Sequence, residues 1–283
     1  MGLAGLHALS LNGAQMHFFH DIQARQIIWT LNFAGQLVLL VVLLGRDRVR
    51  RFPLFTASMV LFALRLLAEE LLATRLVPLI YQQIILAFGD AGVILGLLVL
   101  AELAWRGFRE AKRSVAAINL VGVLIVAGGL LAMSRPWPAL KDLDPSMLYG
   151  RLRLMQFAAI KGDMLVGLLT VELGLLIVIF GRYFKAGWRS HVQQISIGLS
   201  TVAIAQLAIQ TAVQSIFNAA HFNHPDQAEA QRLIALINKL ADADRLIYFA
   251  AVLWWIVWLW LDEPGTPKAS DSESAVEAES PAK

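Results

Sequence analysis

The chain has 283 residues, of which 58% are hydrophobic and only 16% are charged. Soluble domains carry about 25% charged and about 45–50% apolar residues, so this composition excludes a disordered chain and argues against a soluble globular protein. The net charge of +3 is spread over short connecting segments, which leaves no basic domain for nucleic acid. The absence of cysteine excludes disulfides and cysteine-based metal sites.

Seven apolar segments of membrane-spanning character follow one another along the chain. About 20 helical residues cross a hydrocarbon core about 30 Å thick, and continuous apolar runs favour helices over the alternating strands of a barrel. All nine prolines lie outside these segments, where a missing backbone N–H costs little. The sequence therefore predicts an all-α polytopic membrane protein, a seven-transmembrane-helix bundle with spans at 27–44, 54–74, 80–105, 115–133, 157–181, 194–217 and 246–261.

The predicted domain organisation has three parts. Residues 1–26 form an extracytoplasmic N-terminal segment without a signal peptide, residues 27–261 the seven-helix domain, and residues 262–283 a disordered acidic cytoplasmic tail. Within the domain, apolar spacing over 226–244 predicts an amphipathic helix lying on the outer membrane surface.

The distribution of lysine and arginine predicts the orientation. Basic residues are densest in the connections 46–51, 106–113 and 182–189, which are therefore expected to be cytoplasmic. This places the N-terminus outside and the C-terminus inside, in the cell inner (plasma) membrane. The tryptophans are expected to anchor the bundle at the headgroups, with Trp29 and Trp137 at the outer interface and Trp105, Trp188, Trp254, Trp255, Trp258 and Trp260 at the cytoplasmic one.

Charged residues within the predicted spans are the sharpest functional signal. Arg65 and Asp90 each fall about 14 Å from the outer end of their segment, at about 1.5 Å per residue. A charge at a span centre costs about 2.5–3.5 kcal/mol, so these side chains are expected to face protein or water and to pair. Similar depths suggest two interhelical pairs, Arg65 with Asp90, and Lys161 with Glu69 or Glu70.

Further polar residues extend this cluster. Glu172 has no obvious partner at its depth, so an apolar setting keeps it protonated or it lines a cavity. Glutamines recur at every fourth position of the sixth segment and share one face. The whole set is either interhelical glue, at about 0.6 kcal/mol per hydrogen bond, or the lining of a path for a ligand or ion. It comprises Arg65, Glu69, Glu70, Asp90, Lys161, Asp163, Glu172, Gln206 and Gln210.

Two histidine pairs are candidate metal ligands. His17 and His20 precede the first span, and His221 and His224 follow the sixth. Residues three apart share a helix face, so each pair can offer two imidazoles, and a composite site forms if the two span ends are neighbours. The alternative is that these are ordinary interfacial polar residues. A further histidine, His191, lies in a basic connection and is expected to meet lipid headgroups.

Catalytic signatures are missing from the spans. The last segment has no lysine for a retinal Schiff base, and no span has the histidine that a zinc hydrolase or a serine protease of the membrane needs. We therefore expect neither catalysis nor a cofactor. The spacing of Gly92 and Gly96 indicates close helix packing inside the bundle.

A short stretch resembles a known group of sequences. Phe180-Gly181-Arg182, Phe184 and Trp188-Arg189-Ser190-His191, followed by Ile197-Gly198-Leu199, resemble a segment of uncharacterised bacterial seven-helix integral membrane proteins. The resemblance covers about 20 residues and implies an inner-membrane setting, without any activity to carry over.

The sequence thus leaves two functional hypotheses. The first is a non-catalytic sensing or accessory membrane protein. The alternative is a small transporter or channel that moves a proton or polar solute through a charged bundle interior. In both, the expected partner is the lipid bilayer and not nucleic acid.

Overall fold

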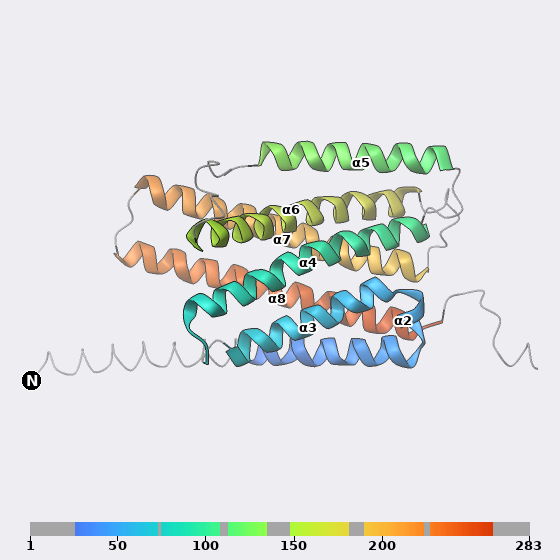
Figure 1. The fold of residues 1–283 in the computed structure, drawn as a ribbon, viewed down its shortest axis with the longest axis horizontal. Coiled ribbons are helices and arrows are strands. Elements are labelled where there is room, and N and C mark those ends of the chain that lie inside the picture. Colours follow the sequence, from blue (N-terminus) through green and yellow to red (C-terminus); the bar gives the residue numbers. More distant parts are fainter. Residues whose placement is uncertain are drawn as a thin grey trace, which may run out of the picture.

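The computed structural model describes residues 26–72, 75–107, 113–134, 148–180, 190–223 and 227–262, and within these ranges the chain is helical and holds no strand. The long helices run side by side along the longest axis of the molecule (Figure 1). They are Gln26–Gly45, which carries no label in Figure 1, α3 (Pro53–Leu72), α4 (Pro78–Gly107), α5 (Arg113–Met133), α6 (Leu148–Phe180), α7 (His191–Asn223) and α8 (Gln227–Trp260), with the short α2 (Arg48–Arg51) after the first.

The helices coincide with the apolar segments of the sequence. Within the described part of the chain, four helical segments are long and apolar enough to cross a membrane, namely Gln26–Gly45, Pro78–Gly107, Gly150–Ile179 and His191–Ala220. This supports the prediction of a helical membrane-embedded protein. The helix expected at 226–244 is present, but it is continuous with the last apolar segment in α8, which runs unbroken for 34 residues, so it does not lie as a separate helix on the membrane surface. No proline or glycine interrupts that stretch, so nothing stops the helix.

Small residues set the register between α4 and α6. A Cβ added at Gly89 would lie 3.5 Å from Ala159 Cβ, and one added at Gly96 would lie 2.9 Å from Val166 Cγ1. The partners advance together along both helices, so α4 and α6 are parallel. Gly92 has nothing within 4 Å of an added Cβ, so of the two glycines in the predicted packing motif only Gly96 meets a neighbouring helix.

Polar side chains tie the Gln26–Gly45 helix to α8. Asn32 Nδ2 donates a hydrogen bond to the Arg245 carbonyl at 3.2 Å, and one turn later Gln36 Nε2 donates to the Tyr248 hydroxyl. Asn32 and Gln36 are 3% and 0% exposed, so these bonds are made in the interior. The two residues act as interhelical glue between parallel helices.

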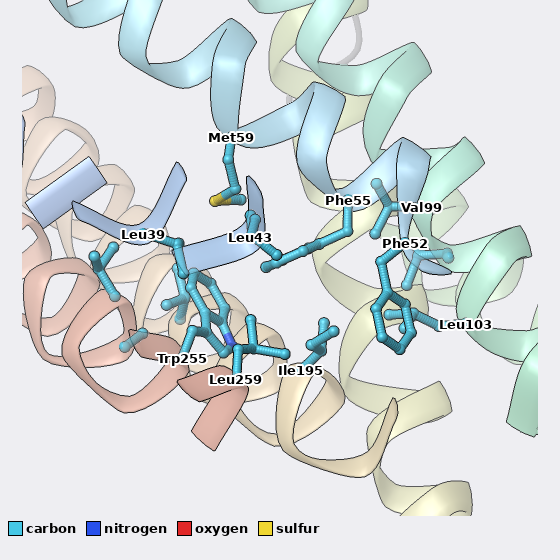
Figure 2. Packing of buried hydrophobic residues seen from close by; sticks show 14 of the residues in the cluster. Leu39, Leu43, Phe52, Phe55, Met59, Val99, Leu103, Ile195, Trp255 and Leu259 are labelled. Carbon is cyan, nitrogen blue, oxygen red and sulfur yellow. The ribbon is translucent and has the colours of Figure 1, made fainter. Parts of the chain in front are cut away.

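Aromatic residues join α3 to α8 in the core. Phe55 meets Trp255 edge to face with ring centroids 5.4 Å apart, and Phe62 lies 5.6 Å from Tyr248, so these two helices are antiparallel. Figure 2 shows Trp255 within the apolar cluster, close to Leu39 and Leu259. The prediction that Trp255 anchors the bundle at the headgroups is wrong, since its side chain is 1% exposed.

One end of the bundle gathers basic residues around the end of α8. Arg48 Nη2 lies 3.4 Å from both the Leu261 carbonyl and Asp262 Oδ1, and His191 Nε2 lies 3.1 Å from the same carbonyl. Basic groups at a helix C-terminus complement its dipole. The expectation that His191 meets headgroups is wrong, because its side chain is 2% exposed. We call this end the basic end, defined by Arg46, Arg48, Arg106, His191 and Asp262.

A carboxylate that the sequence interpretation overlooked caps α3 at the basic end. Glu102 Oε2 of α4 accepts the Phe55 N–H at 3.1 Å, and Glu102 Oε1 lies 3.4 Å from Arg106 Nη2. The first N–H groups of a helix have no partner within it, and a negative charge there is stabilising. Glu102 is therefore a structural tether between α3 and α4.

Candidate functional site

Arg65 pairs within its own helix. Its Nε lies 2.9 Å from Glu69 Oε1, one turn further along α3, and both side chains are about one-third exposed (37% and 33%). An i,i+4 pair of this kind contributes about 0.3–0.5 kcal/mol.

Asp163 of α6 lies within electrostatic range of Arg65 of α3 and Asp90 of α4. Asp163 is exposed, and no hydrogen bond or ion pair joins these three described side chains, so they form a loose group of one base and two acids. The sequence predicted that Arg65 pairs directly with Asp90, and instead Asp163 lies in the electrostatic range of both. Asp90 Oδ1 is buried without a hydrogen-bond partner among the described residues.

Lys161 makes hydrogen bonds on the other side of α6, away from Arg65, Asp90 and Asp163. Its Nζ donates to the carbonyl and the hydroxyl of Ser134 at 3.1 and 2.9 Å, which ties α6 to the end of α5. The predicted pairing with Glu69 or Glu70 is wrong: Glu69 is paired with Arg65, and Glu70 is exposed. Successive helical residues turn by about 100°, so Lys161 and Asp163 point to nearly opposite sides of α6.

The glutamines of α7 do not join the interior cluster. Gln206 and Gln210 are exposed on the surface of the helix, so the prediction that they line an interior path is wrong. Their spacing of four residues correctly predicted that they share one face of the helix, but it did not predict that this face points outward.

Glu172 of α6 stands alone. Both of its carboxyl oxygens are buried and have no hydrogen-bond partner among the described residues. An ionised carboxylate in such a setting costs far more than a neutral one, so we expect Glu172 to be protonated. It does not share the group of Arg65, Asp90 and Asp163.

The predicted metal ligands lie largely outside the described residues. This holds for His17, His20 and His224, while His221 belongs to the last turn of α7 and its side chain is not described. Within the described ranges, no group of three or more histidine, aspartate or glutamate side chains is placed to hold a metal ion. The histidine hypothesis stays a prediction.

Contacts between the helices place the polar residues at one level of the bundle. Asn32 bonds to the Arg245 carbonyl, Lys161 bonds to Ser134, and Asp163 interacts with Arg65 and Asp90. On α7, an added Cβ at Gly167 would lie 3.4 Å from Leu207, so Gln206 lies about one helical turn closer to the basic end than Asp163. We call this level the polar belt, defined by Asn32, Arg65, Asp90, Ser134, Lys161, Asp163 and Arg245.

Next to the belt, burial raises the pKa of Asp244, while neighbouring Arg245 acts to lower it. Arg245 Nη1 itself pairs with Asp242 Oδ1 at 3.0 Å. The group formed by Arg65, Asp90 and Asp163 has one base and two acids, which suits it to a proton or a cationic ligand.

Comparison with protein-family models, curated proteins and solved structures finds no match to this chain.

Proposed function

We propose that the chain is a seven-span, multi-pass protein of the inner membrane, with the N-terminus outside and the C-terminus in the cytoplasm. The positions of the basic connections support this orientation. Gly107, which precedes one of them, lies beside Ile177 near the end of α6 and beside Val192 near the start of α7. Arg48, in another, lies at the end of α8. The described helix ends that flank the three basic connections thus lie at one end of the bundle, which fits the positive-inside rule for cytoplasmic loops.

We infer that the protein is a non-catalytic sensing or accessory membrane protein that responds to a cation at Arg65, Asp90 and Asp163. One observation carries this proposal. Between the polar belt and the basic end, Glu102 and Glu172 are the only acidic or basic side chains among the described residues. Glu102 is engaged with Phe55 and Arg106. A proton relay uses a chain of ionisable groups across the membrane, and a single remaining carboxyl does not form one.

The cation response is tested on purified protein in lipid nanodiscs. We expect spermidine, an organic cation that needs no set of metal ligands, to raise the unfolding midpoint, since a ligand at 100 times its dissociation constant stabilises by about 2.7 kcal/mol. Asp163→Asn should abolish the shift. Asp242→Asn, which removes a half-buried acid paired with Arg245 on α8, should keep it. An unchanged midpoint with spermidine, or equal loss in both variants, would contradict the proposal.

The unpartnered carboxyl of Glu172 favours the transporter alternative, so flux is measured directly. Protein in liposomes that contain a pH-sensitive dye should pass protons no faster than empty liposomes. A flux that Asp90→Asn or Glu172→Gln abolishes would replace the sensing proposal with transport.

A further inference from the structure

Four helices are longer than a bilayer is thick. The helices α4, α6, α7 and α8 have 30, 33, 33 and 34 residues. At about 1.5 Å per residue they are about 45–50 Å long, against a hydrocarbon core of about 30 Å. Each helix must therefore tilt, or project beyond the hydrocarbon by about 15–20 Å.

The projection lies on the side of the polar belt. At the basic end the helices finish together, as the contacts of Gly107 with Ile177 and of Arg48 with the Leu261 carbonyl require. From Arg245 to Leu261 the helical rise gives about 24 Å. Arginine side chains at the basic end reach a few ångströms further toward water, which brings the apolar length close to that of a bilayer core.

The surface changes character at the belt. Toward the basic end, the exposed side chains are mostly large and apolar, such as Val41 (66% exposed), Ile94 (62%) and Ile125 (68%). Beyond the belt, exposed polar and charged residues alternate with apolar ones. The polar and charged ones include Arg151, Gln156, Gln214, Asn218, Arg232 and Lys239. Charged side chains facing acyl chains are costly, so this mixed surface is suited to water and headgroups.

We infer that lipid hydrocarbon surrounds the bundle only between the polar belt and the basic end. The belt then lies among phospholipid headgroups, and residues 148–160 of α6, 208–223 of α7 and 227–244 of α8 form a helical projection in water. Arg65, Asp90 and Asp163 thereby lie at the membrane surface and not at its centre. This inference rests on helix registers and exposure, and it stands whether or not the cation proposal holds.

Two leucines of α8 form a matched test. Leu236 and Leu253 are both 45% exposed, and they lie about 14 Å and about 12 Å from Arg245 on opposite sides of the belt. The chain has no cysteine, so Leu236→Cys and Leu253→Cys each introduce a single thiol into the full-length protein. A membrane-impermeant maleimide is applied to right-side-out and inside-out vesicles, and total thiol is measured after denaturation.

We expect Leu236→Cys to label at least tenfold faster than Leu253→Cys in intact membranes, and both to label fully once denatured. If the belt lay at mid-bilayer, both thiols would be in hydrocarbon, and equal resistance to labelling would overturn the inference. Equal, fast labelling would overturn it as well. The vesicle type in which Leu236→Cys reacts separately tests the orientation given under Proposed function.

Discussion

Glu102→Leu is expected to lower the free energy of unfolding by about 2–3 kcal/mol, because it leaves the buried Phe55 N–H without an acceptor and Arg106 without its carboxylate. The Arg106 side chain is 33% exposed and can turn toward water, which limits the cost of losing its partner. The Phe55 N–H at the start of α3 is buried and cannot turn toward water in the same way. The eight tryptophans of the chain provide the fluorescence signal for thermal unfolding in detergent.

Two further variants separate this capping role from a general effect of removing a buried acid. Glu102→Gln keeps an oxygen acceptor for Phe55 and should lose less than half as much stability. Glu172→Leu removes a carboxyl whose oxygens have no hydrogen-bond partner among the described residues. The free energy of unfolding of this variant should therefore be unchanged or higher. Equal losses for Glu102→Gln and Glu102→Leu would mean that the capping bond contributes nothing.

Gly198→Ala is the second substitution with a large expected effect, a loss of about 1–3 kcal/mol through overpacking. An added Cβ at Gly198 would lie 2.7 Å from Trp255 Cε2, closer than side chains approach one another. The Trp255 ring cannot move aside easily, because Phe55 packs against it edge to face and its side chain is 1% exposed. Glycine at this position is what lets α7 pack closely against the Trp255 indole.

Gly122→Ala on α5 is the matched control. An added Cβ there has nothing within 4 Å, and alanine favours a helix by about 0.5–1 kcal/mol over glycine. We expect this variant to unfold at the same temperature as the unmodified protein or slightly higher. If both glycine variants were destabilised alike, the contact between Gly198 and Trp255 would not be the cause.

The helices could be predicted from the sequence because continuous apolar runs and proline positions are local properties. Helix rotation is not local. Lys161 and Asp163 are two residues apart, and nothing in the sequence says that Asp163 lies within electrostatic range of Arg65 while Lys161 reaches Ser134. The same limit applies to Gln206 and Gln210, whose shared face was predicted but whose exposure was not.

Two further features, the membrane depth of the charged residues and the capping of α3 by Glu102, are limited by different properties of the sequence. The depth of Arg65 and Asp90 was counted from the ends of apolar runs and stays a prediction, which the labelling of Leu236→Cys and Leu253→Cys tests. Glu102 was overlooked because, four residues before Arg106, it looks like an ordinary surface ion pair. A signal was present, however: α3 begins at Pro53 after Phe52, which has no side-chain oxygen to cap a helix, so the acceptor had to come from another element.

The position of the polar belt depends most directly on the parallel register of α4 and α6, which disulfide cross-linking measures. A Cβ at Gly89 would lie 3.5 Å from Ala159 Cβ, within the range of about 3.5–4.5 Å that a disulfide bridges. In a chain without native cysteine, Gly89→Cys with Ala159→Cys should lose both free thiols on mild oxidation in membranes and yield the linked peptides. Gly92→Cys with Ala159→Cys, in which the first position has nothing within 4 Å, should keep them. Free thiols in the first pair, or linkage in the second alone, would contradict the register and with it the belt.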